Sequence, residues 1–290
     1  MPIDFLIGTE PGPAGLAAML ERALELKREP RSSNALERRV VALLFERPST
    51  RTRVSFEAGI VELGGHPMVL RGDELQLSRG ESVRDTALVL GRHADAIGIR
   101  TGPHEAVEEL AEHAGVPVFN MLSSLHHPCQ ALADMLTLLE AFGSLEGLRL
   151  AYVGDGNNVA RSLAIVGSAL GVEVVVASPE GYELAGETPA TLVRDPAAAV
   201  AGANAVYTDV WVSMGDEATA DARRSALEPY RLDDALLDRA APGAIAMHCL
   251  PAHPGEEIEA SVLYGDRQRI WDAAENRRHV QKALLEALLA

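Results

Sequence analysis

The sequence predicts an α/β protein of two similar domains, each a mainly parallel sheet flanked by helices, with the active site in the cleft between them. Three observations support this fold class. Short apolar runs of strand length alternate with segments of helical periodicity, which is typical of parallel sheets covered by helices. Polar clusters follow the ends of the predicted strands. The length of 290 residues suits two domains rather than one.

The composition is that of a globular protein in a reducing compartment. Hydrophobic residues make up 47% of the chain and charged residues 23%, and no apolar run approaches the ~20 residues of a membrane span. The first residues carry no basic and hydrophobic signal, and the two cysteines, Cys129 and Cys249, are too few for a disulfide framework. We therefore expect a cytoplasmic protein.

The first half of the chain predicts four strands alternating with helices. An amphipathic first helix is built on Leu16, Met19 and Leu20 and ends at Pro30. A continuous apolar run at 40–45 has the character of a buried parallel strand. The remaining predicted strands are 68–70, 96–100 and 116–119, with helices from 54 to 63, from Ser82 to about 93, and over 103–115.

The second half repeats this rhythm after a polar interruption at 123–130, where we place the domain junction. Pro128 suits the first turn of the next helix. Predicted strands follow at 148–153, 172–177, 205–208 and 244–247, with a helix that ends at Leu170. The last helix, from about Glu275, is expected to pack back on the first domain. The predicted domains are therefore 1–124 with 275–290, and 125–274.

The turn between the strand at 40–45 and its helix is the strongest candidate for a binding site. A formal net charge of −16 argues against nucleic acid as a partner and means that an anionic substrate needs a local basic patch. Ser49 to Arg53 supply hydroxyl groups and two guanidinium groups at a helix start, where free N–H groups favour an anion. The alternative is a capped helix with solvated arginines. We favour a site for a phosphate-bearing ligand.

Polar residues also gather at the carboxyl ends of the other predicted strands. Open α/β sheets hold their ligands at that edge, although polar loops follow strands in any fold. The clusters lie after Phe45, at Arg100, after Phe119, after Val153, after Thr208 and after Met247.

Several of these clusters resemble the signature stretches of the aspartate/ornithine carbamoyltransferase family. Any one of them can occur by chance, but the ordered set covers nearly the whole chain and is highly specific. The last two of the four main stretches are similar to those of the ornithine branch. The four are Ser49-Thr50-Arg51-Thr52-Arg53, His127-Pro128-Cys129-Gln130, Asp209-Val210-Trp211-Val212-Ser213-Met214-Gly215 and His248-Cys249-Leu250-Pro251, accompanied by Arg79-Gly80-Glu81-Ser82 and Ala274-Glu275-Asn276-Arg277.

The resemblance implies transfer of the carbamoyl group from carbamoyl phosphate to the δ-amine of L-ornithine, which gives citrulline and phosphate, a step of arginine biosynthesis. It implies that the first domain binds carbamoyl phosphate and the second binds ornithine. It also implies no metal, no organic cofactor and a homotrimer whose sites are shared between subunits.

The resemblance assigns carbamoyl phosphate to residues of several loops. Arg100 and His127, with Thr52, would surround the carbonyl oxygen, where donors stabilise the charge of a tetrahedral intermediate. Gln130 would accept from the carbamoyl NH₂, and Gln76 would reach the neighbouring subunit's site. The other implied contacts are Ser49, Thr50, Arg51 and Thr52 with the phosphate, Arg277, and Cys249 and Leu250 through their backbones. Arg53 is equally consistent with a phosphate contact and with a side chain that points away from the ligand and supports the loop.

Ornithine recognition is implied for the second domain. Cys249 would lie near the δ-amine and accept or relay its proton, so that the implied catalytic residues are Arg51, Arg100, His127 and Cys249. We expect His248 to point to the opposite face of its strand, which disfavours a cysteine-hydrolase pair, and we expect Cys129 to pack in the core. Arg161 is consistent with binding an extra acidic group of the acceptor or with a side chain that faces solvent. The residues implied for the amino-acid end are Asn158, Asp209, Ser213 and Met214.

Two other classes of protein remain as alternatives. Gly154-Asp155-Gly156 follows a predicted strand, as in dinucleotide-binding dehydrogenases, but Val159 stands where the third small residue belongs. A binding regulator without catalysis is the second alternative, although it would be expected to have lost Arg51, His127 or Cys249. Within the family, aspartate, putrescine and N-acetylornithine remain possible acceptors.

Overall fold

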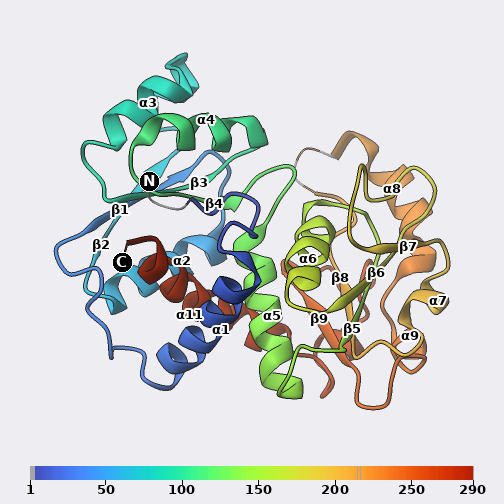
Figure 1. Cartoon of the computed structure of the whole chain (residues 1–290). Coiled ribbons are helices and arrows are strands. Elements are labelled where there is room, and N and C mark those ends of the chain that lie inside the picture. The colour runs from blue at the N-terminus through green and yellow to red at the C-terminus, as the bar shows by residue number, and fades with distance from the viewer. Residues whose placement is uncertain (1–3, 214, 216, 290) are drawn as a thin grey trace. The chain divides into compact units, whose positions relative to one another are not determined.

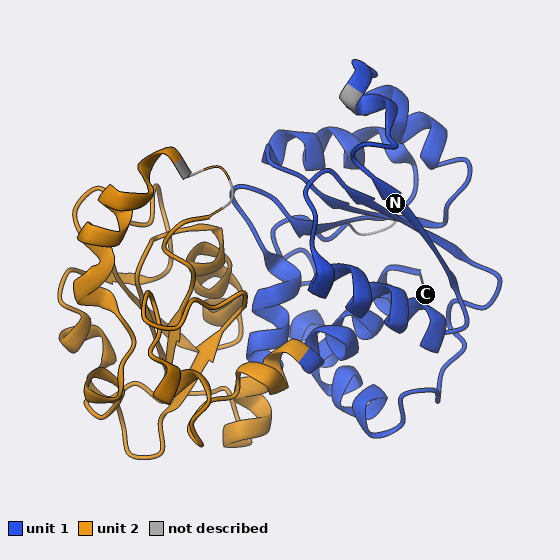
Figure 2. Ribbon diagram, turned by 180° about the vertical axis from the view of Figure 1, so that it is seen from behind, with its two compact units in different colours: residues 1–136, 275–290 blue, residues 137–274 orange. Residues whose placement is uncertain are grey.

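The chain folds into two compact units, each built on its own parallel sheet with helices on both faces (Figures 1 and 2). This computed structural model describes residues 4–213, 215 and 217–289. Unit 1 comprises Met1–Leu136 and Glu275–Ala290, and unit 2 comprises Thr137–Ala274. All the strand pairings between named strands are parallel, as the alternation of strands and helices predicted.

Unit 1 contains a four-stranded sheet in the order β2-β1-β3-β4. Strand β1 is the apolar run Val40–Phe45, and five of its six residues are buried because helices cover both faces of the sheet. The other strands are β2 (His66–Arg71), β3 (Ala96–Arg100) and β4 (Val118–Leu122). The helices are α1 (Gly12–Arg28), α2 (Thr50–Glu62), α3 (Val83–Leu90) and α4 (His104–Ala114), with a 3-10 turn η1 (Gln76–Arg79).

Apolar side chains fix the helices of unit 1 to opposite faces of its sheet. Leu44 and Ile97 pack with Val107 and Leu110 of α4 in one buried cluster, which also includes Ala87 of α3. On the opposite face, Phe56 of α2 stacks on Phe119 of β4 with ring centroids 5.0 Å apart. Figure 1 shows α3 and α4 above this sheet and α1, α2 and α11 below it.

Unit 2 contains a five-stranded sheet in the order β7-β6-β5-β8-β9. One face packs in a buried cluster with residues of the short helices, such as Val200, Leu237 and Leu263. The strands are β5 (Arg149–Val153), β6 (Glu173–Ala177), β7 (Thr191–Val193), β8 (Ala205–Thr208) and β9 (Ile245–His248). The helical segments are α6 (Asn158–Ala169), α7 (Pro196–Val200), η2 (Glu217–Thr219), α8 (Ala220–Leu227), η3 (Glu228–Tyr230), α9 (Asp234–Leu237) and α10 (Ala260–Leu263).

Two helices cross the division between the units. Helix α5 runs over Pro128–Phe142 and α11 over Ile270–Leu289. The junction predicted from the sequence lies at 124/125, but the first turns of α5 belong to unit 1, and the division falls at Leu136/Thr137. Because a helix continues through this point, no loop marks the division in the sequence. Helix α11 likewise begins before the expected Glu275.

The predicted helix starts are explained by local capping. The Ser49 side chain caps α2 by accepting from the N–H of Thr52, and Ser82 caps α3 by accepting from the N–H of Asp85. The Gly64-Gly65 pair ends α2 as predicted, with Gly64 in the left-handed region at φ 81°. Strand β7 and the short helices α7 to α10 were not predicted, because such short elements carry little periodicity. Among the described residues, no helix combines the length and apolar character needed to cross a membrane.

Candidate active site

The strand orders locate a candidate site in each unit. In unit 1 the chain runs from β1 outward to β2 and then returns to β3 on the other side of β1, so the strand order reverses between β1 and β3. In unit 2 the reversal lies between β5 and β8. Ligands of open α/β sheets bind beyond the carboxyl ends of strands at such a switch point. At or just beyond the carboxyl ends of these four strands lie Ser49 to Thr52, Arg100, Asn157 with Asn158, and Asp209.

The first turn of α2 forms the base of the unit 1 site. The Ser49 hydroxyl donates to the Thr52 hydroxyl at 3.0 Å, and Thr52 is fully buried. Thr50 is exposed and Arg51 half-buried at the same helix start. Free N–H groups and the positive end of the helix dipole therefore lie beside a guanidinium group, as an oxyanion requires.

Arg277, from α11, joins this turn to helix α5. Its guanidinium donates from Nη2 to Thr52 Oγ1 at 2.6 Å and from Nη1 to Gln130 Oε1 at 2.7 Å. Arg277 is 3% exposed, and Gln130 is 1% exposed and donates to Asp134 Oδ1 at 2.9 Å. The carbonyl oxygen of Gln130 thus already accepts one hydrogen bond, which leaves one lone pair for the expected carbamoyl NH₂.

His127, at the start of α5, is a neutral histidine among arginines. Burial and then the charges of three guanidinium groups hold the pKa of His127 well below its usual range. The three groups, in order of their effect, belong to Arg277, Arg100 and Arg51. Unit 1 therefore brings together the predicted Arg51, Thr52, Arg100, His127, Gln130 and Arg277 in a local basic site, despite the acidic chain.

Two predicted or considered residues of unit 1 lie apart from this cluster. Gln76 is exposed at the start of η1 and makes no hydrogen bond to the other site residues that the structure describes. Arg53 is exposed and pairs with Glu57 at 3.0 Å, which agrees with the supporting role considered for it.

Cys129 is 1% exposed in the core, as expected, and burial raises the pKa of its thiol to about 12.

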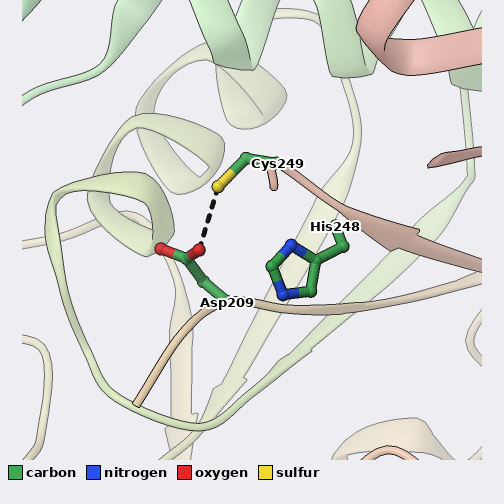
Figure 3. Close-up of side chains that lie close together, drawn as sticks. All are labelled: Asp209, His248 and Cys249. Carbon is green, nitrogen blue, oxygen red and sulfur yellow. Dashed lines mark hydrogen bonds between the residues drawn. The ribbon is translucent and has the colours of Figure 1, made fainter. Parts of the chain in front are cut away.

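The unit 2 site is centred on Asp209, which follows β8 (Figure 3). Its Oδ1 accepts from the Cys249 thiol at 2.9 Å, and its Oδ2 accepts from Asn157 Nδ2 at 2.8 Å. Asn157 also caps α6, since its Oδ1 accepts from the N–H groups of Val159 and Ala160. The carboxylate is 5% exposed, so these two donors hold its direction firmly.

His248 does not point to the opposite face as the strand alternation predicted. One of its nitrogens lies within 4.8 Å of Cys249 Sγ and a carboxylate oxygen of Asp209 (Figure 3). Strand β9 ends at His248, so the alternation of side chains along a strand does not extend to Cys249.

The His248 ring is nevertheless not paired with the thiol. Its Nδ1 accepts from the N–H of Leu250 at 2.8 Å, and Nε2 lies 3.1 Å from Glu257 Oε1. Nδ1 is therefore an acceptor, and Nε2 carries the ring proton and donates a hydrogen bond to Glu257. The prediction that His248 points away from Cys249 was wrong, but both ring nitrogens are engaged by other groups, Leu250 and Glu257.

The other residues predicted for the acceptor site have mixed outcomes. Asn158 begins α6 next to Asn157, and Ser213 is half-buried after β8, while Met214 lies outside the described residues. Arg161 donates to the carbonyl oxygen of Ala185 and so is engaged by the protein itself. This contact lowers the case for Arg161 as a ligand of an extra acidic group.

Sequence reasoning missed four side chains that organise these sites. Asn157 and Asp134 were overlooked because the residues next to them in the sequence belong to more distinctive motifs. The four-residue spacing of Gln130 and Asp134 on one helix was nevertheless a usable signal. Glu257 gave no local signal. Arg223 donates to Asp155 Oδ2 at 2.9 Å and to the Trp211 carbonyl oxygen at 3.3 Å, and it thereby ties the loop after β5 to the loop after β8.

Two groups of described side chains have ligand atoms within 4.8 Å of one another and could hold a metal ion: Asp209 with His248 and Cys249, and His253 with Glu256 and Glu257. In the first, the histidine nitrogens and the thiol already make the bonds described above. In the second, Glu256 pairs with Arg224 at 3.2 Å and Glu257 with His248. Coordination at either place would have to replace these interactions.

The chain matches two family models that together cover most of its length. Residues 5–140 match the aspartate/ornithine carbamoyltransferase carbamoyl-P binding domain, and residues 146–288 match the Asp/Orn binding domain of the same family. Among curated relatives, the ornithine carbamoyltransferase of Halalkalibacterium halodurans is 48% identical over 99% of this chain and 95% of that protein. That of Acidothermus cellulolyticus is 50% identical over 98% and 96%.

Solved structures of the same family share the fold over the full chain. The ornithine carbamoyltransferase of Thermus thermophilus superposes with a TM-score of 0.93 at 44% identity and covers 100% of both chains. That of Pyrococcus furiosus gives a TM-score of 0.92 at 45% identity over 98% of this chain and 96% of that one. The two parallel-sheet units, the arginine-rich site and the matched models lead to one conclusion: the chain belongs to the aspartate/ornithine carbamoyltransferase family.

Proposed function

We propose that this protein transfers the carbamoyl group of carbamoyl phosphate to the δ-amine of L-ornithine, forming L-citrulline and phosphate. The observation that carries the proposal is the basic site of unit 1, where three guanidinium groups act on a buried, neutral His127. Ornithine as acceptor is supported by the names of the relatives and by the Asp209 carboxylate, which suits a cationic amino-acid end.

In this proposal, unit 1 binds the phosphate and polarises the carbonyl group. Ser49, Thr50, Arg51 and the first turn of α2 hold the phosphate oxygens. Arg100, His127 and Thr52 face the carbonyl oxygen, where negative charge grows as the amine nitrogen attacks. A neutral His127 donates to this oxygen without repelling the neighbouring arginines. The nitrogen–carbon bond then forms, and the carbon–oxygen bond to phosphate breaks with its electron pair going to the phosphate.

The amine must lose a proton during this transfer, and unit 2 offers a route for it. Cys249 Sγ donates to Asp209 Oδ1 at 2.9 Å, so the sulfur is a thiol with its proton directed at a carboxylate. It can take up the amine's proton as it passes its own to Asp209. Asn157 keeps the second carboxylate oxygen in place, and we propose that Asn158, Ser213, Met214 and the backbone of Leu250 complete the substrate contacts.

The decisive experiment is an assay of carbamoyl phosphate with each amine in turn. We expect ornithine to be carbamoylated far faster than aspartate, putrescine or N-acetylornithine. Arg161 donates a hydrogen bond to the Ala185 carbonyl oxygen, so its guanidinium is not directed at an acidic group of an acceptor. Comparable turnover of aspartate or N-acetylornithine would contradict the proposal.

We also propose a homotrimer in which Gln76 completes the neighbouring subunit's anion site. Its support is the exposed position of Gln76 on η1, apart from its own chain's cluster. Arg51→Ala and Gln76→Glu should each be nearly inactive alone. Refolded together in equal amounts, they should recover activity at about a quarter of the sites, because each contributor is correct half the time. Mixed trimers that stay inactive would exclude a shared site.

We finally propose that the reaction serves arginine biosynthesis in the cytoplasm. Cys129 and Cys249 are not joined in a disulfide, which suits a reducing compartment. Expression of this protein in a strain that lacks ornithine carbamoylation should restore growth without added citrulline or arginine. Expression of the catalytically inactive Arg51→Ala variant should not.

A further inference from the structure

A buried hydroxyl, that of Ser123, is the centre of a polar network behind the unit 1 site. Ser123 is fully buried in the loop between β4 and α5. Its Oγ lies 2.9 Å from His104 Nδ1 and receives hydrogen bonds from Asn120 Nδ2 and from the N–H of His126, both at 3.2 Å. The N–H of Ser123 donates to the His126 carbonyl oxygen at 2.8 Å, which closes the loop on itself.

The geometry fixes the direction of the hydrogen bond between Ser123 and His104. A hydroxyl oxygen has two acceptor positions, and the N–H groups of Asn120 and His126 fill both. For the hydroxyl hydrogen, His104 Nδ1 at 2.9 Å is a better placed acceptor than the His126 carbonyl oxygen at 3.5 Å, and this geometry favours donation to Nδ1. Nδ1 of His104 is thus unprotonated, and its ring proton lies on Nε2.

The environment of His104 agrees with a neutral ring. His104 is 5% exposed, and burial lowers its pKa, against the smaller opposing effects of Glu108, Glu105 and Glu10. Glu108 Oε1 lies 3.9 Å from Nε2, on the side that carries the proton. The His126 ring meets the His104 ring edge to face at 4.8 Å between centroids. A proton on His104 Nδ1 would direct a third N–H group at Ser123 Oγ, whose two acceptor positions are already filled by Asn120 and His126.

This hydrogen bond connects the two loops that present the proposed donors to the carbonyl oxygen. His104 begins α4, four residues after Arg100, and Ser123 lies four residues before His127. Two backbone hydrogen bonds also join these loops. The N–H of residue 124 donates to the carbonyl oxygen of residue 102 at 2.7 Å, and the N–H of residue 101 donates to the carbonyl oxygen of residue 122 at 3.0 Å. The separation of Arg100 and His127 therefore depends on how these loops are joined.

We propose that His104 and Ser123 are positioning residues, and that the bond from the Ser123 hydroxyl to His104 Nδ1 sets the distance between Arg100 and His127. The inference rests on the proposed function, in which both donors face the same oxygen. Donors aimed at a developing charge lose their effect when they are misplaced, so a loosened loop lowers turnover more than substrate binding.

The first test compares variants that remove or keep the acceptor at position 104. His104→Leu and Ser123→Ala should each lower kcat by roughly 10- to 100-fold, with smaller changes in the KM of either substrate. His104→Asn should keep most of the activity, because its Oδ1 occupies nearly the place of Nδ1. His113→Leu, on the same helix but outside the network, is the matched control and should behave as wild type.

Two outcomes of this comparison would overturn the inference. One is a folded His104→Leu or Ser123→Ala variant with wild-type kcat. The other is a His104→Asn variant as impaired as His104→Leu, which would mean that packing and not the hydrogen bond matters. Wild-type protein in the same assay tests the proposed function separately, because its failure to carbamoylate ornithine would refute that function whatever the variants do.

The double variant His104→Leu/Ser123→Ala measures whether the two residues act through one bond. If they do, its kcat should be no lower than that of the more impaired single variant. Effects that multiply would show two independent roles and would overturn the proposal.

The proton assignment can be checked on wild-type protein without relying on a variant's folding. Selective ¹⁵N labelling of the nine histidines, with long-range proton–nitrogen spectra at neutral pH, distinguishes the two ring nitrogens. We expect a pyridine-like Nδ1 and a pyrrole-like Nε2 for His104, identified by the resonances missing in His104→Asn. The opposite tautomer, or a charged ring at neutral pH, would refute the direction of the bond.

Discussion

Replacing Arg277 by methionine should weaken carbamoyl phosphate binding far more than the same change at the adjacent Arg278. Arg277 is 3% exposed and donates two hydrogen bonds, at 2.6 Å to Thr52 and 2.7 Å to Gln130. Methionine fills a similar volume but supplies no charge and no donor. One charged contact to an anionic oxygen contributes about 1.5–3 kcal/mol, which corresponds to a roughly 10- to 150-fold rise in Kd.

Calorimetric titration with carbamoyl phosphate, and with inorganic phosphate as a stable probe, measures this loss directly. The adjacent Arg278→Met is the matched control, because its guanidinium pairs with Glu62 at 3.2 Å and with Glu275 at 3.6 Å instead of with the site residues. The reasoning would be refuted if Arg277→Met bound both ligands as wild type does, or if Arg278→Met weakened them equally.

The same substitution should change the titration of His127. Burial and three positive charges lower the pKa of His127, and Arg277 is the strongest of the three charges. Without Arg277 the histidine should take up a proton at a higher pH than in the wild type. Histidine-selective NMR of both proteins, carried to the lowest pH at which they stay folded, would show this shift, and an unchanged His127 titration would exclude the charge effect.

Three further predictions concern other parts of the chain. Burial, and then the charges of Lys282 and Arg278, lower the pKa of His279 to about 4. Below the unfolded value of about 6.5 the unfolded chain therefore holds a proton that the folded protein lacks, and stability falls as the pH drops from there toward 4. His279→Leu should reduce that slope by up to about 1.4 kcal/mol per pH unit in urea melts at pH 4.5 to 6.5; an unchanged slope would contradict the assignment. Cys249→Ser should lower turnover and ornithine affinity more than carbamoyl phosphate affinity, whereas Cys129→Ser should change little; loss of carbamoyl phosphate binding alone would show that the thiol has another role. Lys282 is fully buried and donates to Glu62 Oε2 at 2.6 Å, so Lys282→Met should cost about 3–5 kcal/mol of unfolding free energy, and a loss under 1 kcal/mol would show that the pair contributes little.

The sequence alone determined the features that depend on neighbouring residues. The strand at Val40–Phe45, the caps at Ser49 and Ser82, and the end of α2 at Gly64 all follow from periodicity and from hydrogen bonds within a few positions. The alternation of strands and helices also determined that both sheets are parallel. The candidate residues of unit 1 were found because their motifs end predicted strands.

The tertiary structure decided how distant segments complete the sites. Arg277 and Thr52 are 225 positions apart, and nothing near either residue specifies that one donates to the other. Asn157, the neighbour of the predicted Asn158, donates to Asp209, because the cap of α6 turns its side chain toward β8.

The remaining differences have the same physical origin. His248 lies near Cys249 because β9 ends at His248 and the strand alternation does not extend to Cys249. The units divide within α5, where a continuous helix leaves no sign of the junction in the sequence. Periodicity and capping act over one or two turns of chain. The partner of a buried polar group is chosen instead by which segments the packing of the sheets and helices brings within hydrogen-bond distance.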